Sequence, residues 1–130
     1  MNGTKKVGVW MDYASAHIME FSETPFEVKT IKSKFSSNEK ANGLAKGENH
    51  LHSKERQFKA DYFKEIAKFL LAYNKVILFG PTNAKTELFN LLSEDNSFFN
   101  TRIHLEETSK MTLNQRKKFV HDHFVNPLYK

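Results

Sequence analysis

Two pairs of histidines are the first residues in this sequence whose type and spacing could do chemistry. His50 and His52, and again His121 and His123, are separated by one residue, a spacing that places two imidazoles on one face of a strand. The second pair lies in a segment with helical periodicity, where residues i and i+2 diverge, and the first pair has no third ligand at a fixed spacing. We therefore expect no metal site and no cofactor.

Motifs for nucleophilic catalysis and for phosphate cradling are also missing. The sequence has no Cys, which excludes disulfides, thiolate zinc sites and Cys nucleophiles. It has no Gly-x-Ser-x-Gly elbow and no Ser/His/Asp order. Gly80-Pro81-Thr82 follows an apolar run and precedes a helical pattern, but it lacks the glycine spacing of a Walker loop and favours a plain strand-to-helix turn. We therefore predict a protein that is not an enzyme.

Basic residues are the second chemical signal, and they are concentrated in one segment. Of the net charge of +5, the excess lies in residues 29–64, which carry nine Lys or Arg against four acids. Residues 1–28 carry two against four, and residues 65–130 carry nine against seven. A local excess indicates a polyanionic partner better than an evenly basic surface does, although a solvated lysine-rich surface accounts for the same charges.

Hydrophobic periodicity predicts the elements that position these residues. Residues 33–50 are polar, with glycines at 43 and 47, and we expect them to form a flexible basic loop. Thr112 and Gln115 form a capping box at the start of the last helix. The predicted elements are strands at about 7–11, 14–21 and 26–31, a helix at 51–70, a strand at 76–79, a helix at 82–92, a strand at 102–105 and a helix at 112–125.

This order of elements predicts one α/β domain over residues 1–130. The short turns between the first three strands favour an antiparallel meander, and the later alternation of helix and strand favours a mixed sheet. The longest apolar runs, residues 7–11 and 69–73, are too short for a signal peptide or a membrane span. We therefore expect a cytoplasmic protein that does not contact membranes.

Three segments, in this order, resemble the central domain of the eukaryotic and archaeal class-1 release factor and of its ribosome-rescue relative Pelota. They are residues 7–18 (VGVWMDYASAHI), the basic loop that leads into residues 54–63 (KERQFKADYF), and residues 76–88 (VILFGPTNAKTEL). The resemblance spans nearly the whole chain, about residues 5–124, and is shared by small stand-alone bacterial proteins described as components of the translation machinery. It implies a ribonuclease-H-like fold, with a mixed five-stranded sheet packed with three helices.

The resemblance also bears on activity, through the loop before the long helix. Release factors carry a Gly-Gly-Gln tripeptide in that loop, and it promotes peptidyl-tRNA hydrolysis. The corresponding residues 42–49 (NGLAKGEN) contain no Gly-Gly pair and no Gln, so the hydrolase activity does not carry over. The sequence is closer to the Pelota branch, whose domains also lack the tripeptide and are not hydrolases.

What the resemblance does carry over is a basic loop and helix start that lie against RNA phosphates. Contacts of this kind are sensitive to salt and tolerant of sequence. We predict from it a non-catalytic domain that binds the ribosome or structured RNA and is related to translation termination and rescue factors. The residues that it implies for RNA binding are Lys40, Lys46, Lys54, Arg56 and Lys59.

Two alternatives stay open, and the oligomeric state is not predicted. The same charges suit a protein-interaction module whose loop becomes ordered on an acidic partner. A metal-dependent ribonuclease-H-like nuclease is the other alternative, because Asp12 ends the first strand, where such an enzyme holds a metal carboxylate. That chemistry needs several acids converging on two metals, and no spacing selects partners for Asp12, which is also a good turn residue before Tyr13 and Ala14.

Overall fold

The structure is a computed structural model that describes residues 5–22, 25–34 and 48–126, with the backbone alone at 48–53. The helices and strands follow the predicted order closely. They are β1 (Lys6–Met11), β2 (Ser15–Glu20), β3 (Phe26–Lys32), α2 (Glu48–Leu70), β4 (Lys75–Gly80), α3 (Ala84–Ser93), a short 3-10 helix η1 (Asn96–Phe98), β5 (Arg102–Glu107) and α4 (Leu113–Val125).

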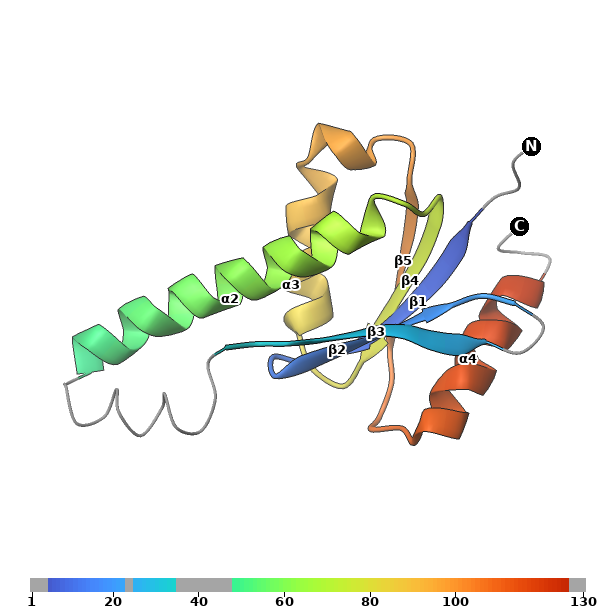
Figure 1. The fold of residues 1–130 in the computed structure, drawn as a ribbon, viewed down its shortest axis with the longest axis horizontal. Helices are drawn as coiled ribbons and strands as arrows, with labels where there is room; N and C mark the ends of the chain where they lie inside the picture. Colours follow the sequence, from blue (N-terminus) through green and yellow to red (C-terminus); the bar gives the residue numbers. More distant parts are fainter. Residues whose placement is uncertain (1–4, 23–24, 35–47, 127–130) are drawn as a thin grey trace.

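The strands form one mixed sheet in the order β3-β2-β1-β4-β5 (Figure 1). β1, β2 and β3 pair antiparallel through short turns, whereas β1, β4 and β5 pair parallel. Parallel neighbours need a crossover, which the helices between these strands supply. The predicted α/β class is therefore confirmed: the described residues form a mixed five-stranded sheet packed with three α-helices.

The helices cover both faces of the sheet. α2 and α3 lie on one face and α4 on the other (Figure 1), and a separate apolar cluster fills each interface. The central strands β1 and β4 are almost wholly buried, which explains their continuous apolar sequences. Gly8 of β1 lets α4 approach closely, because a Cβ at this position would overlap Val120 Cγ2.

The start of α2 and the exposure of one apolar residue differ from the sequence predictions. The helix predicted at 51–70 begins at Glu48, so the predicted loop at 33–50 is too long at its end. Apolar periodicity missed this first turn because it holds only polar residues before Leu51. Leu113 has the apolar spacing that predicts a position facing the core, but it is 43% exposed, since the first turn of α4 precedes the buried Val120 and Phe124.

The last helix begins as predicted. Thr112 accepts a hydrogen bond from the Gln115 amide, and the Gln115 side chain accepts one from the Thr112 amide, which completes the capping box. In the part of the chain that the structure describes, no helix is both long enough and apolar enough to cross a membrane.

Candidate functional site

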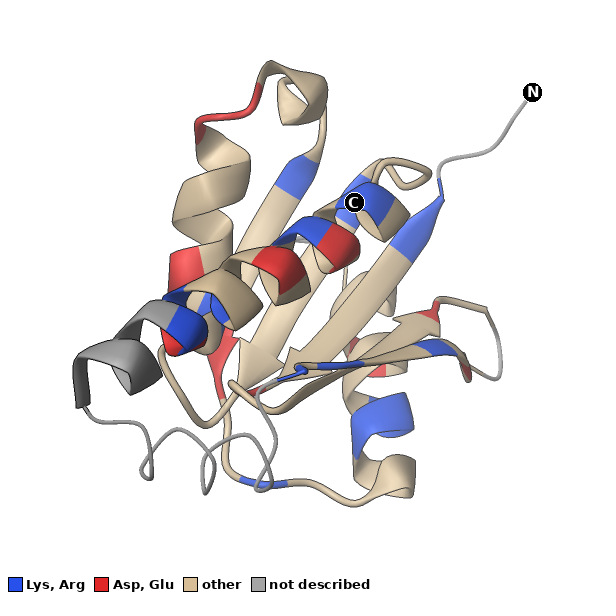
Figure 2. Cartoon of the chain, turned by 60° about the vertical axis from the view of Figure 1, so that its left-hand side comes forward, with Lys and Arg blue, Asp and Glu red and all other residues tan. Residues whose placement is uncertain are grey.

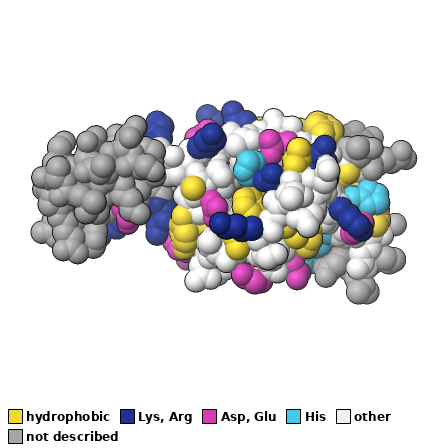
Figure 3. Space-filling model, turned by 90° about the horizontal axis from the view of Figure 1, so that it is seen from below, with side chains coloured by type: hydrophobic (Ala, Val, Ile, Leu, Met, Phe, Trp, Pro, Cys, Tyr) yellow, Lys and Arg dark blue, Asp and Glu magenta, His cyan; other side chains and the backbone are white. Residues whose placement is uncertain are grey.

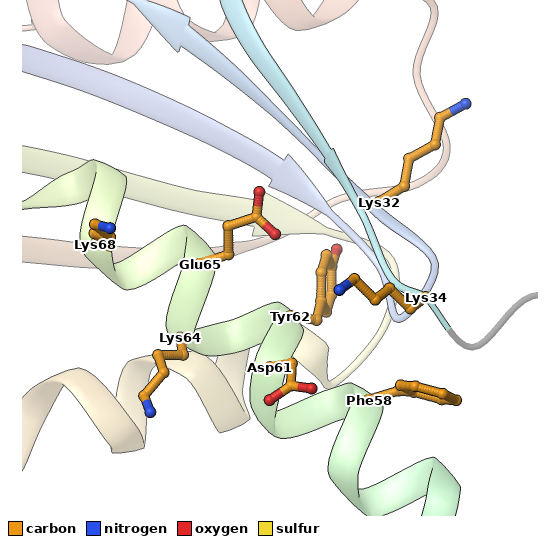
Figure 4. Close-up of a pocket in the computed structure, with 8 residues that line it drawn as sticks. All are labelled: Lys32, Lys34, Phe58, Asp61, Tyr62, Lys64, Glu65 and Lys68. Carbon is orange, nitrogen blue, oxygen red and sulfur yellow. The ribbon is translucent and has the colours of Figure 1, made fainter.

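A groove of about 280 Å³ lies between α2 and the end of β3 (Figure 4). The helix supplies residues at intervals of three or four, so that they share one side of α2. The strand end supplies two lysines, one of which extends toward the ring of Tyr62. The lining residues are Lys32, Lys34, Phe58, Asp61, Tyr62, Lys64, Glu65 and Lys68.

The groove carries an excess of positive charge. Its four lysines are exposed, and among the described residues none of the four forms an ion pair, in contrast to Lys59, Lys85 and Lys118. Two carboxylates, Asp61 and Glu65, offset only part of this charge. The lysines are therefore available to an anion, and at physiological ionic strength their field extends about 8 Å before it is screened.

Tyr62 forms a rigid part of the groove. Its side chain is 2% exposed, and its hydroxyl donates a hydrogen bond to the backbone oxygen of Asp12 at 2.8 Å. Burial, and to a lesser degree the charge of Asp12, raise the pKa of Tyr62 well above its usual range. The phenol therefore stays neutral and fixes α2 against the turn between β1 and β2.

Of the residues predicted for RNA binding, the three that the structure describes do not line this groove. Lys40 and Lys46 lie outside the described residues. Lys54 and Arg56 lie on α2 before the groove, half-buried and exposed respectively. Lys59 faces α3, where its Nζ lies 2.9 Å from Glu87 Oε1. The groove lysines were missed because Lys32 and Lys34 lie at the end of β3 and just after it while the other two lie on a helix, and only the fold brings them together.

The charge of α2 itself is mixed. Figure 2 shows basic residues (blue) alternating with acidic ones (red) along the helix, and the face seen in Figure 3 mixes basic, acidic, histidine and apolar groups without one continuous basic patch. The groove therefore stands out because four lysines without an ion pair to a described residue are gathered in one concave site, not because of a uniform positive field.

Asp12 serves the turn between β1 and β2. Its Oδ1 accepts hydrogen bonds from the amides of Ala14 and Ser15 at 2.8 and 3.0 Å, which is the bonding expected of an Asp turn residue. Among the described residues, no group of three or more His, Asp or Glu side chains is placed to hold a metal ion. The geometry at Asp12 therefore fits the turn interpretation.

Glu87 links the turn to α2. Its carboxylate accepts a hydrogen bond from the Tyr13 hydroxyl and pairs with Lys59. These hydrogen bonds, the one from Tyr13 first, lower the pKa of Glu87, while burial and Glu87 raise the pKa of Tyr13 to about 12. Lys59 also lies 5.9 Å above the centre of the Tyr13 ring. Glu87 therefore stays ionised and neutralises Lys59.

The other sequence motifs are the Gly80-Pro81-Thr82 segment and the two pairs of histidines. Gly80 ends β4 with a φ of 150°, and α3 begins at Ala84, so this segment is the predicted strand-to-helix turn. His50 and His52 lie in α2, and their side chains are outside the described residues. In α4, His123 packs 5.5 Å from the ring of His104, and burial, followed by this neighbour, lowers its pKa to about 4. His121 instead lies 3.3 Å from Asp122.

No protein-family model matches the sequence, and no curated protein matches it. The structure is similar to solved structures of two translation factors. Pelota from Thermoplasma acidophilum has a TM-score of 0.58 and 20% identity over 85% of this chain. Pelota from Archaeoglobus fulgidus has a TM-score of 0.61 and 13% identity over 91% of this chain. The archaeal translation termination factor aRF1 has a TM-score of 0.54 and 16% identity over 89% of this chain.

These similarities establish the fold. The chain spans about a third of each of these proteins, covering 30%, 31% and 33% of their lengths. Identities this low carry no residue roles across. The chain therefore has the fold of a Pelota- and release-factor-like domain, and the mixed sheet with its helices on both faces fits the ribonuclease-H-like arrangement.

Proposed function

We propose that this domain binds RNA, in the ribosome or in another structured RNA, without catalysing a reaction. The observation that carries the proposal is the groove between α2 and β3, where Lys32, Lys34, Lys64 and Lys68 are exposed and make no ion pair with any described residue. Lysines arranged in this way suit phosphate groups, which supply most of the affinity in sequence-tolerant binding.

The groove extends the basic region predicted from the sequence. Lys54 and Arg56 precede it along α2, and Lys40 and Lys46 belong to the segment that joins its two sides in the sequence. We propose that these four residues contribute to the same RNA surface. Lys59 contributes less, because its charge is already neutralised by Glu87.

The absence of catalysis is part of the proposal. Asp12, which follows β1, is engaged in the turn, and Glu87 of α3 is engaged in the contact with Lys59. The sequence lacks the Gly-Gly-Gln of release factors. The fold shared with Pelota and aRF1 supports a place in translation termination or rescue, and with it the ribosome as partner and the cytoplasm as location.

Co-sedimentation with ribosomes across a salt series tests this function. We expect the wild type to sediment at low salt and to be released steeply as salt rises. The groove variant Lys64→Glu/Lys68→Glu is expected to stay in the supernatant. The matched control is Arg102→Glu/Lys110→Glu, which makes the same charge change at exposed positions on and after β5, at the opposite edge of the sheet.

Two results would count against the proposal. A wild type that stays in the supernatant even at low salt would reduce the similarity with translation factors to one of fold. Equal loss of binding in the groove variant and the control would attribute binding to net charge rather than to this site. Circular dichroism of each variant verifies that the fold is retained.

A further inference from the structure

The groove holds more than a phosphate requires. Exposed lysines alone would suit any polyanion, yet Asp61 and Glu65 line the same groove on the helix side, and both carboxylates repel phosphate. Aromatic side chains complete the lining, with Tyr62 buried and Phe58 half-buried. Cations, carboxylates and aromatic rings in one groove match the three parts of a nucleotide: the phosphate, the hydrogen-bonding edge of the base, and its flat face.

The size of the groove points to a single unpaired nucleotide. Its volume of about 280 Å³ is at the lower end of small-ligand pockets, which begin at about 300 Å³. Double-stranded RNA is recognised across a wide surface that spans successive grooves, whereas single strands offer unstacked bases that enter pockets and lie against aromatic rings. Figure 4 shows Phe58 projecting from α2 at the outer end of the groove, where such a base would enter.

The carboxylates indicate which bases fit. Asp61 and Glu65 accept hydrogen bonds and, when ionised, donate none. The exocyclic amino group of cytosine is a donor that Asp or Glu accepts from in base recognition. Uracil presents a carbonyl oxygen in the place of that amino group, and this oxygen repels a carboxylate. Cytosine therefore suits the two carboxylates better than uracil, whose one donor on this edge, N3–H, lies between two carbonyl oxygens.

We propose that the groove between α2 and β3 binds one unpaired nucleotide of single-stranded RNA and prefers cytidine to uridine. The lysines hold the flanking phosphates, Phe58 supplies the apolar wall beside the buried Tyr62, and Asp61 and Glu65 accept from the base. This inference rests on the proposed RNA-binding function and deepens it by naming the form of RNA and the base that the site selects.

Fluorescence anisotropy with labelled oligocytidine and oligouridine of equal length tests the inference. We expect the full chain to bind oligocytidine about fivefold or more tightly, the lower end of the discrimination that one well-placed base contact gives. In the variant Asp61→Asn/Glu65→Gln we expect the ratio of the two affinities, oligocytidine over oligouridine, to fall toward one. The variant should also bind oligouridine more tightly than the wild type does.

The matched control is Glu94→Gln/Glu106→Gln, which removes the same two charges at exposed positions outside the groove. If the acids acted only through net charge, both variants would bind the two oligonucleotides more tightly by the same factor and would keep their ratio. Our inference requires the ratio to change in the groove variant alone.

The outcomes separate this inference from the function on which it rests. Salt-sensitive binding to ribosomes with equal affinity for oligocytidine and oligouridine would overturn the base preference and leave the proposed function intact. Binding to an RNA duplex as tight as to the single strand would overturn the single-strand assignment. A wild type that binds neither ribosomes nor either oligonucleotide would overturn both proposals.

Discussion

Lys85 is a buried cation at the start of a helix, and its partner is largely in water. Its side chain is 4% exposed, and Nζ donates to Glu107 Oε1 and to the Thr82 backbone oxygen, both at 2.6 Å. The Glu107 side chain is 69% exposed. Because the positive end of the helix dipole disfavours a cation in the first turn of α3, Lys85 depends on these two acceptors. Together they tie the start of α3 to the end of β5.

The substitution Glu107→Gln keeps an oxygen acceptor but removes the charge. Breaking a fully buried ion pair costs about 3–5 kcal/mol, because the remaining charge is left uncompensated, whereas an exposed pair contributes about 0–1 kcal/mol. Here one partner is buried and the other is in water, and Lys85 keeps the Thr82 oxygen. We therefore expect Glu107→Gln to lower the free energy of unfolding by about 1–2 kcal/mol.

Lys85→Met removes the buried charge and keeps an unbranched apolar chain. Replacement of a buried charged group by an apolar one is often neutral or stabilising, so we expect a free energy of unfolding within about 1 kcal/mol of the wild type. In the Lys85→Met protein, Glu107→Gln should leave the free energy of unfolding almost unchanged, because the cation that needs the carboxylate is gone. The two substitutions together form a double-mutant cycle.

Urea unfolding of the four proteins, followed by the fluorescence of Trp10, gives the free energies. Trp10 is the only tryptophan and is 8% exposed, so its emission reports the loss of the core. The reasoning fails if Glu107→Gln costs the same with and without Lys85. It also fails if Lys85→Met is much more destabilising than Glu107→Gln, since the buried charge would then be a net source of stability.

Three further predictions follow from single positions. Gly80→Ala should lower the free energy of unfolding by more than about 3 kcal/mol in urea unfolding, because φ is +150° and a Cβ would overlap the Met11 oxygen. The folded pKa of His123 is about 4, so from about pH 6.5 down to 4 only the unfolded chain gains a proton; stability should fall by on the order of 1 kcal/mol, and His123→Gln should flatten that loss. Glu87→Gln should free Lys59 for a phosphate contact. The slope of the logarithm of the RNA-binding constant against the logarithm of the salt concentration should then steepen by about 0.7, the value of one further phosphate contact. An unchanged slope would leave Lys59 outside the interface.

Most of the fold was predictable because its signals are local. The alternation in residues 7–11 and the capping box of Thr112 and Gln115 each act within one element, and both predictions agree with the structure. The errors occur where the local signal ends. The polar first turn of α2 carries no apolar periodicity, and Leu113 has the right spacing for the core but lies in a turn that precedes the buried part of α4.

The candidate site was harder to predict because its residues come from different elements. Lys34 and Lys64 are 30 positions apart in the sequence, and nothing in either segment indicates that they line one groove. The pairing of Lys59 with Glu87, 28 positions away, is equally invisible to a local pattern. Charge counting therefore located the basic segment, but it could not separate lysines that are neutralised from those that are exposed to a ligand.

Asp12, the acid that suggested catalysis, and Glu87 both hold the fold together in the structure. The backbone oxygen of Asp12 accepts from Tyr62, and Glu87 binds both Tyr13 and Lys59. Both contacts join α2 to its surroundings beside the turn between β1 and β2, and Tyr62, which makes one of them, also lines the groove that the helix forms with β3. Because α2 is fixed at two positions along its length, the groove lysines of the helix keep a defined position relative to those of the strand. A groove held in place in this way suits the binding function proposed above, and Asp12 and Glu87 contribute to it by fixing the position of the helix.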